Sequence, residues 1–346
     1  MWNATGQAAM AFNASMDVMI GPACTDDMRA ANELLTYFAM PSVTGGGNLV
    51  DSTSGYPYLT RCSFNTLGIW MFLLDFTKRH GWINIVLIYD SDSNDIATET
   101  QSLRSLLKER GMMVYDTPIN ATHFDNFDSV PTVLRDGSRN GRVFIILLSG
   151  QLFRYFLTTA YRIGMGDGEF VFISLDLFHE QVLGSLASWQ QRDGYDDEAK
   201  KAYSHLLVLS LKNTSSSATH QQFVKDVHSS IDARRRYNEA APPLYPTVNY
   251  YMGAFHDVVV MLGRAIRQAI DDGVEMWPRT YKYRSGEVSE TSRNLANNIT
   301  QRLRNVSFQG VSGTVYMDSD GDRVQDMTIY YMLDTGSGSF AVGVLH

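Results

Sequence analysis

The sequence has few cysteines, short hydrophobic runs and a deficit of positive charge. Cys24 and Cys62 are its only cysteines. The best apolar run, Val143–Leu148, is far shorter than the roughly 18–20 residues that span a bilayer. No signal peptide is recognisable in this sequence, which opens directly on Met-Trp-Asn. The formal net charge of −8 argues against nucleic acid or an anionic membrane surface as the main partner.

Motifs for catalysis and metal binding are also lacking. Gly310–Gly313 has its second glycine one residue too early for a nucleophile elbow, and Gly45–Gly47 lacks the lysine of a phosphate-binding loop. Asp318–Arg323 begins like a calcium loop, but arginine stands where glycine is required, so a turn is favoured. The histidines and cysteines form no zinc pattern. We therefore expect a binding protein with no catalytic residues, metal or cofactor in this chain.

Near-continuous apolar strands alternate with amphipathic helices along most of the chain. The strand Trp82–Tyr89, the helix Asp95–Arg110 and the strand Val143–Leu148 show the pattern clearly. Strands with two apolar faces indicate parallel sheets that are covered by helices on both sides. The expectation is an α/β fold, in two lobes because domains usually hold roughly 100–200 residues.

The two ends of the chain depart from this alternation. A short apolar helical stripe, Ala8–Phe12, comes before any strand, although an α/β domain usually begins with one. We infer that the first strand and any signal sequence have been lost from this sequence. Near the other end, Gly313–Met317 and Asp326–Met332 flank a turn-rich run and predict a β-hairpin.

Asn-X-Ser/Thr sequons indicate an extracellular, glycosylated protein. The six sequons begin at Asn3, Asn13, Asn120, Asn213, Asn298 and Asn305. In an oxidising compartment, two cysteines predict one disulfide, Cys24–Cys62, worth about 4 kcal/mol in the chain-entropy model. The alternative is a cytosolic protein with chance sequons and two free thiols.

Several short motifs follow one another in the order and spacing of the extracellular ligand-binding domains of natriuretic-peptide-type receptors. They are Asp17–Thr25 (DVMIGPACT), Phe38–Gly45, Tyr58–Arg61, His80–Trp82, Ile88–Tyr89 and Phe308–Arg323. Over nearly its whole length the chain resembles these receptors, and among them the receptor guanylyl cyclases. Amino-acid receptors and bacterial leucine-binding proteins are more distant relatives of the same fold.

The resemblance implies a type I periplasmic-binding-protein fold, in which two Rossmann-like lobes are joined by three crossings. One lobe is expected at residues 1–89 plus 247–300, and the other at 90–246 plus 301–346. The resemblance further implies a homodimer on the extracellular face of the plasma membrane. The membrane span and the cyclase would follow this segment. A chloride ion near the Gly21–Cys24 turn is also implied by the resemblance.

In such folds, ligands meet the carboxyl ends of strands from both lobes. The ligand-binding candidates are Thr25, Gly45, Gly46, Tyr89, Ser91, Ser149, Gln151, Asp176 and Phe178. Turn geometry alone could explain the glycines, and helix capping could explain Thr25. Receptors of the peptide type bind hormone between two membrane-proximal lobes, so an empty interlobe cleft is a second expectation.

The leading hypothesis is a receptor ectodomain that converts the binding of an extracellular peptide or small molecule into dimer rearrangement. The alternative is a free-standing binding protein for an amino acid or another small solute. An enzyme on a doubly wound fold ranks third, because its motifs are missing.

Overall fold

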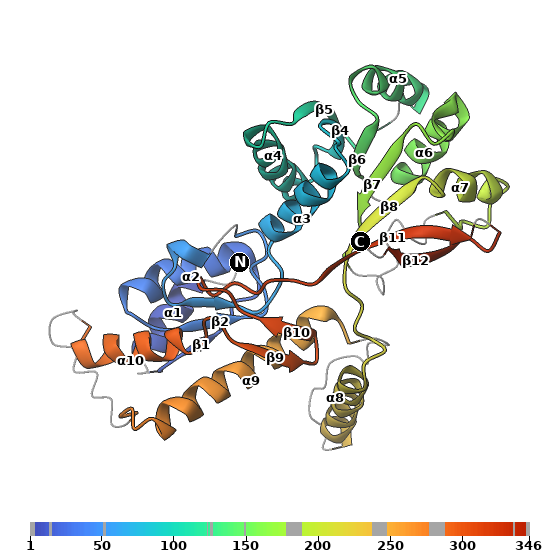
Figure 1. Cartoon of the computed structure of the whole chain (residues 1–346). Coiled ribbons are helices and arrows are strands. Elements are labelled where there is room, and N and C mark those ends of the chain that lie inside the picture. Colours follow the sequence, from blue (N-terminus) through green and yellow to red (C-terminus); the bar gives the residue numbers. More distant parts are fainter. Residues whose placement is uncertain are drawn as a thin grey trace. The chain divides into compact units, whose positions relative to one another are not determined.

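The structure is a computed structural model that divides into two compact units (Figure 1). It describes residues 4–13, 16–50, 53–122, 124, 127–148, 150–177, 189–236, 248–276, 288–334 and 336–343. Unit 1 comprises Met1–Gly68 and Asn213–Gln325, and unit 2 comprises Ile69–Lys212 and Asp326–His346. Among the helices in these ranges, none is both long and apolar enough to cross a membrane.

Unit 2 is built on a seven-stranded sheet with the order β12-β11-β8-β7-β6-β4-β5. Its strands are β4 (Asn84–Asp90), β5 (Met113–Ile119), β6 (Val143–Leu147), β7 (Val171–Leu175), β8 (Leu206–Leu211), β11 (Met327–Asp334) and β12 (Ser339–Gly343). The strands β4 to β8 pair in parallel, whereas β11 is antiparallel to both β8 and β12. This confirms the predicted α/β class.

Helices cover both faces of this sheet (Figure 1). They are α3 (Thr66–Arg79) and α4 (Asn94–Glu109) on one side, and α5 (Val130–Asn140), α6 (Gly150–Ala160) and α7 (Asp196–Tyr203) on the other. Alternate strand residues point to opposite faces. Val86, Ile88 and Phe144 therefore join the core under α5, α6 and α7, while the buried Ile85 and Leu87 face the other way.

Unit 1 has a smaller parallel sheet and longer helices. Its elements are β1 (Met19–Ile20), β2 (Ser42–Thr44), β3 (Leu59–Arg61), β9 (Ser307–Gly310), β10 (Gly313–Tyr316), α1 (Ala4–Asn13), α2 (Thr25–Tyr37), α8 (Ala218–Arg236), α9 (Tyr250–Asp271) and α10 (Glu290–Gln301). The strands β1, β2 and β3 pair in that order, and β9 with β10 forms a hairpin. The main core joins α9 and α10 to Val43, Cys62 and Val315.

The predicted lobe boundaries differ from those of the two units. Residues 69–89 belong to unit 2, because β4 is an inner strand of the large sheet between β5 and β6. Residues 213–246 and 301–325 are assigned to unit 1, although both were expected in the second lobe. The three crossings therefore follow Gly68, Lys212 and Gln325 rather than residues 89, 246 and 300.

The predicted hairpin of Gly313–Met317 with Asp326–Met332 is wrong. β10 pairs with β9, which precedes it, and β11 joins the sheet of unit 2. The turn between them folds on itself instead, because one carboxylate oxygen of Asp318 accepts hydrogen bonds from the amides of Asp320, Gly321 and Asp322. The run Asp318–Arg323 therefore forms a turn, as the sequence predicts.

Candidate functional site

The predicted ligand-binding residues lie at the carboxyl edges of the two parallel sheets, in one group per unit. Thr25, Gly45 and Gly46 follow β1 and β2 in unit 1. Tyr89 and Ser91 end or follow β4 in unit 2, where Gln151 follows β6 and Asp176 follows β7. Ser149 and Phe178 lie outside the described residues.

At the edge of unit 1, the two glycines allow close backbone contacts. The Gly47 amide donates a hydrogen bond to the Ala23 carbonyl, and Thr44 Oγ1 donates to the Pro22 carbonyl at 2.6 Å while accepting from the Gly46 amide. A Cβ atom on Gly46 would collide with the Ala23 carbonyl. One on Gly45 would lie 2.8 Å from the Phe255 amide nitrogen in α9. Packing therefore accounts for both glycines.

Gly46→Ala is expected to destabilise the protein by about 1–3 kcal/mol, the usual cost of overpacking. The obstructing Ala23 carbonyl is backbone, so it cannot rotate away as a side chain would. Thermal unfolding followed by circular dichroism measures the loss. Gly55→Ala is the control, because its Cβ would meet nothing within 4 Å. Equal melting temperatures for the two variants would contradict the packing argument.

The polar side chains near the carboxyl ends of β2 and β3 form hydrogen bonds with one another. Asn48 Nδ2 donates to the Tyr251 hydroxyl at 2.5 Å, and Ser63 Oγ donates to Asn48 Oδ1 at 2.9 Å. Thr25 is the first residue of α2, after Cys24 at the N-cap, and its Oγ1 accepts from the Leu49 amide at 3.4 Å. The hydrogen-bonding groups of these side chains at the strand ends of unit 1 are thus used within the protein.

The predicted Cys24–Cys62 disulfide is absent, and both thiols are free. Cys24 is exposed at the start of α2, whereas Cys62 is fully buried in the core with Val43 and Val258. Burial raises the pKa of the Cys62 thiol to about 12, partly offset by Arg323. The pair is separated because Cys24 lies at the exposed start of α2, while Cys62 follows the edge strand β3 and packs into the core. Cys62 is thus an inert core residue.

In unit 2, β4 has β5 on one side and β6 on the other, so the strand order reverses at β4–β6. Such a switch point usually borders a ligand crevice. Ser91 ties this edge together, since its amide and its hydroxyl both donate to the Ile119 carbonyl, at 2.8 and 3.0 Å. Asp176 is buried, and its amide donates to the Leu209 carbonyl.

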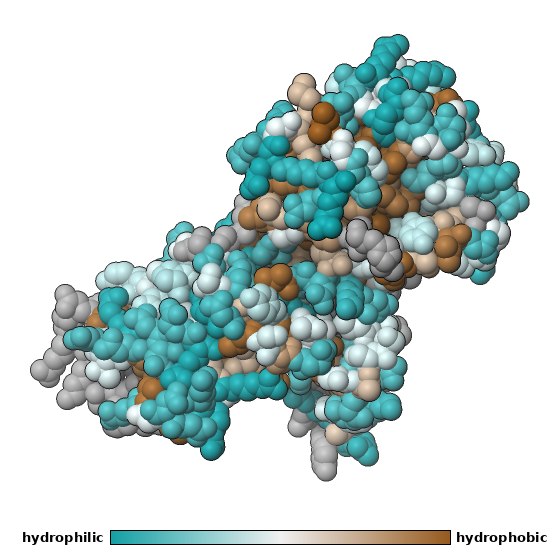
Figure 2. All heavy atoms as spheres, in the orientation of Figure 1, coloured by the Kyte–Doolittle hydropathy of each residue, from teal (hydrophilic) through white to brown (hydrophobic). Residues whose placement is uncertain are grey.

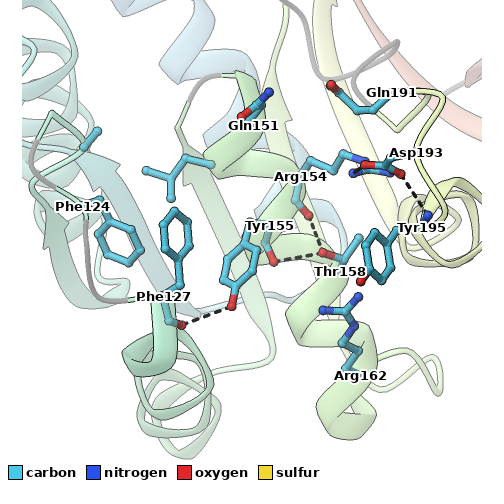
Figure 3. Close-up of a pocket in the computed structure, with 12 residues that line it drawn as sticks. Phe124, Phe127, Gln151, Arg154, Tyr155, Thr158, Arg162, Gln191, Asp193 and Tyr195 are labelled. Carbon is cyan, nitrogen blue, oxygen red and sulfur yellow. Dashed lines mark hydrogen bonds and ion pairs between the residues drawn. The ribbon is translucent and has the colours of Figure 1, made fainter.

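A pocket of about 530 Å³ in unit 2 brings together Gln151 and residues that the sequence did not single out (Figure 3). It lies along the outer face of α6. We call it the α6 groove and define it by Phe124, Phe127, Gln151, Tyr155, Arg162 and Tyr195. Tyr155 follows Gln151 by four residues, and Arg162, in the turn after α6, follows Tyr155 by seven. These spacings correspond to about one and two helical turns, so the three side chains lie on the same face. The opposite face of α6 buries Phe153, Phe156 and Leu157.

Aromatic rings form one side of the groove. Phe124 and Phe127 meet edge to face with centroids 5.3 Å apart, and Phe127 meets Tyr155 in the same way at 4.8 Å. Phe124 also contacts Phe156 at 5.9 Å, which anchors the cluster to the core of unit 2. This wall is therefore held in place by packing.

Ion pairs form the other side and join α6 to α7. Arg154 donates to both carboxylate oxygens of Asp193, at 2.7 and 2.8 Å, and to Asp196 at 3.0 Å. Arg162 binds both oxygens of Glu198 at 2.7 Å. These bonds hold the pKa of the Asp193 and Glu198 carboxyls below their usual values and raise the pKa of the two guanidinium groups.

Acid is expected to loosen α7 from α6 before the rest of unit 2 unfolds. A carboxyl with a lowered pKa stabilises the fold fully above its ordinary value, here 3.8 for Asp193 and 4.5 for Glu198. That stabilisation is lost as the pH falls through the lower folded value. Hydrogen exchange of the α7 amides, measured from pH 7 downward, should show the loss. Glu198→Gln should reproduce it in part at pH 7, and unchanged exchange would contradict the role of the pairs.

Sequence reasoning missed the aromatic half of the groove, because it searched only the ends of strands. A polar and aromatic stripe on α6, opposite a stripe of phenylalanine and leucine, could have marked the helix face. Phe124 and Phe127 carry no comparable signal, since they lie in a connection after β5. Within the described part of the chain, no group of three or more acidic, histidine or cysteine side chains could hold a metal ion.

Comparison with known proteins gives a consistent family. The family described as "Receptor family ligand binding region" matches residues 3–335. Atrial natriuretic peptide receptor 3 from Bos taurus is 25% identical over 346 residues, which cover 98% of this chain and 59% of that receptor. A receptor-type guanylate cyclase from Caenorhabditis elegans is 25% identical over 350 residues, which cover 87% of this chain and 25% of the cyclase. This chain thus spans little more than half of the first relative.

Two bacterial solved structures share the fold. The leucine binding protein LivK from Thermotoga maritima has a TM-score of 0.55 at 16% identity, over 99% of this chain and 83% of LivK. A substrate-binding protein of an ABC transporter from Desulfitobacterium hafniense, in complex with Leu, has a TM-score of 0.57 at 19% identity, over 98% and 84%. The type I periplasmic-binding-protein fold is thereby confirmed. Since the family match runs through both units, this chain belongs to the family of receptor ligand-binding regions.

Proposed function

We propose that this chain is the extracellular ligand-binding domain of a single-pass membrane receptor of the guanylyl cyclase type. The single observation behind the proposal is the family match over residues 3–335, with natriuretic peptide receptors and a receptor guanylate cyclase among the relatives. In this proposal the segment binds an extracellular peptide or small molecule and catalyses nothing itself. The membrane span and the cyclase belong to other parts of the protein.

The proposed output is a rearrangement within a homodimer. A ligand can shift such an equilibrium only by as much as its affinity differs between the two arrangements. The chloride ion near Gly21–Cys24 remains a prediction within this proposal. The alternative, a free-standing amino-acid-binding protein, draws only on the bacterial structures, which share the fold at 16–19% identity. The hydrogen-bonded strand ends of unit 1 favour the receptor over that alternative.

Three measurements test the proposal. Antibody labelling of this segment in the full-length protein should succeed on intact, unpermeabilised cells, and analytical ultracentrifugation of residues 1–346 should show a reversible dimer. Native mass spectrometry of the same sample should show no bound amino acid. A monomer released into the medium with an amino acid bound would overturn the receptor proposal and support the alternative.

Glycan occupancy is expected to differ among the sequons. Asn120, Asn213 and Asn305 are exposed and lie outside helices, so we expect them to be the more accessible sequons. Asn298 lies within α10, where its Oδ1 accepts a hydrogen bond from Arg302 Nε at 2.8 Å and the sequon's Thr300 is buried. We expect lower occupancy at Asn298, read by mass spectrometry after glycosidase release in heavy-oxygen water.

Asn3 lies outside the described residues, and the Asn13 side chain is not described, so neither enters this ranking. Substituting the exposed sites one at a time by glutamine is the control, since each change should remove one glycan. Full occupancy at Asn298 with bare exposed sites would contradict the ranking. An unglycosylated protein on the cell surface would contradict the glycosylation prediction alone.

A further inference from the structure

We propose that the α6 groove binds an uncharged aromatic small molecule, at a site within unit 2 alone. The inference rests on the volume, the rings and the charge pairing of this groove. It does not depend on the proposed receptor function, because none of these three observations involves a membrane, a dimer or a cyclase.

The size of the groove suits a whole small molecule. Its volume of about 530 Å³ lies within the range of roughly 300–1,000 Å³ that is usual for small-molecule sites. Its residues come from three stretches of chain: the connection after β5, the outer face of α6, and the segment before α7 (Figure 3). The outer face of α6 forms the floor of the groove. The connection after β5 forms one bank, and the segment before α7 forms the other.

The groove exposes aromatic surface on both banks. Phe127 is 44% exposed on one side and Tyr195 is 59% exposed on the other. Figure 2 shows hydrophilic and hydrophobic residues interspersed on the visible face of the molecule. Phe127 already meets Tyr155 edge to face, which fixes the ring and leaves part of it open. A third ring entering the groove could stack on these side chains in the offset or edge-to-face geometries that aromatic pairs prefer.

The charges of the groove are already paired, which selects against a charged ligand. Arg154 is bound by two carboxylates and by the Trp189 carbonyl at 3.1 Å. Arg162 is bound by Glu198, and its guanidinium also lies 5.3 Å from the centroid of the Tyr195 ring. A charged ligand would have to break these pairs or lose its own hydration without gaining a partner. An uncharged ring pays neither cost.

Two features give the site hydrogen-bonding groups and a fixed end. The Gln151 amide stands at the start of α6, on the face that lines the groove, where it can both donate and accept (Figure 3). At the other end, α6 runs into the turn Tyr161–Met165, which carries Arg162 and kinks at Gly164, whose φ is 91°. A glycine in this conformation is a common way to end a helix, so it fixes the end of the groove. The favoured ligand is therefore a ring with one neutral polar edge, such as an indole or a phenol.

Isothermal titration of the purified chain with indole tests the proposal directly. We expect one binding site per chain, with a stoichiometry of one. Tyr155→Ala and Phe127→Ala should each weaken binding about three- to ten-fold, the effect of losing one aromatic pair. Tyr316→Ala is the matched control, because Tyr316 is 47% exposed in unit 1 and should leave the affinity unchanged.

Charged analogues sharpen the test. Indole-3-acetate and tryptamine carry the same ring with opposite charges, and both are expected to bind more weakly than indole. Tighter binding of either would overturn the assignment of an uncharged ligand. An absence of indole binding at millimolar concentration, or binding that survives Tyr155→Ala and Phe127→Ala together, would overturn the site. Circular dichroism of each variant excludes unfolding as the cause of a loss.

Discussion

Asp322→Ala is expected to destabilise unit 1 by about 3–5 kcal/mol, the usual cost of leaving one partner of a buried ion pair uncompensated. Asp322 Oδ1 accepts from Arg61 Nε at 2.8 Å, and Arg61 is 0% exposed. The same guanidinium donates to the carbonyls of Gly47 and Val50, so it cannot turn toward solvent without breaking them. Asp322 Oδ2 also accepts from the Thr53 amide at 3.0 Å. Removing the carboxylate therefore leaves the Arg61 guanidinium and the Thr53 amide without this acceptor.

Hydrogen exchange of the β2 and β3 amides measures the loss of unfolding free energy in unit 1 separately from that in unit 2. Asp271→Ala is the control, because the Arg267–Asp271 pair is exposed and should contribute under about 0.5 kcal/mol. Arg61→Met combined with Asp322→Leu should be more stable than Asp322→Ala alone, since no buried charge is then left unpaired. Similar losses for Asp322→Ala and Asp271→Ala would show that the buried pair carries no special cost.

The elements of the fold are readable from the sequence because burial on both faces leaves a local pattern. Trp82–Tyr89 and Val143–Leu148 are apolar at successive positions, and both become inner strands of the large sheet, as β4 and β6. The helix predicted at Asp95–Arg110 matches α4 because its leucines recur on one face, between Ser93 at the N-cap and Gly111. Local patterns of this kind specify an element and its buried face.

The partners of the elements are not readable in the same way, because pairing depends on distant residues. Asp326–Met332 is recognisably a strand, but nothing in it specifies β8 rather than β10 as its neighbour. Assigning it to a local hairpin was the wrong choice, and the third crossing was misplaced with it. The first boundary failed for a related reason, since residues 69–89 read equally well as the end of one lobe or the start of the next.

The candidate site was predicted in part. The rule of carboxyl strand ends placed Gln151 at the α6 groove, but it also selected Gly45 and Gly46, which serve backbone packing. Buried charges were missed because single residues do not reveal their burial. Asp257 offered the best signal, as a carboxylate between Phe255 and Val258 in an otherwise apolar helical stripe. A charge in such a place costs too much unless it is hydrogen bonded.

That carboxylate supports the second large prediction: Asp257→Ala should destabilise unit 1 by about 3–5 kcal/mol. Asp257 lies in α9 and is buried. Its Oδ1 accepts from the Val311 amide at 2.9 Å, and its Oδ2 accepts from the Ser312 amide at 2.9 Å and from Ser312 Oγ at 2.5 Å. Each buried donor left without an acceptor costs roughly 1–3 kcal/mol. Hydrogen exchange of the β9 and β10 amides measures the loss.

A double-mutant cycle with Gly310 tests the geometry behind this prediction. A Cβ atom on Gly310 would collide with the Asp257 carboxylate, so Gly310→Ala should be strongly destabilising in the natural protein. Once Asp257→Ala has removed the carboxylate, the added methyl group has room, and the same change should cost much less. His256→Ala is the control, because its side chain is 41% exposed and touches Asp257 from outside. Additive costs for Gly310→Ala and Asp257→Ala would show that the hairpin turn does not rest on this carboxylate.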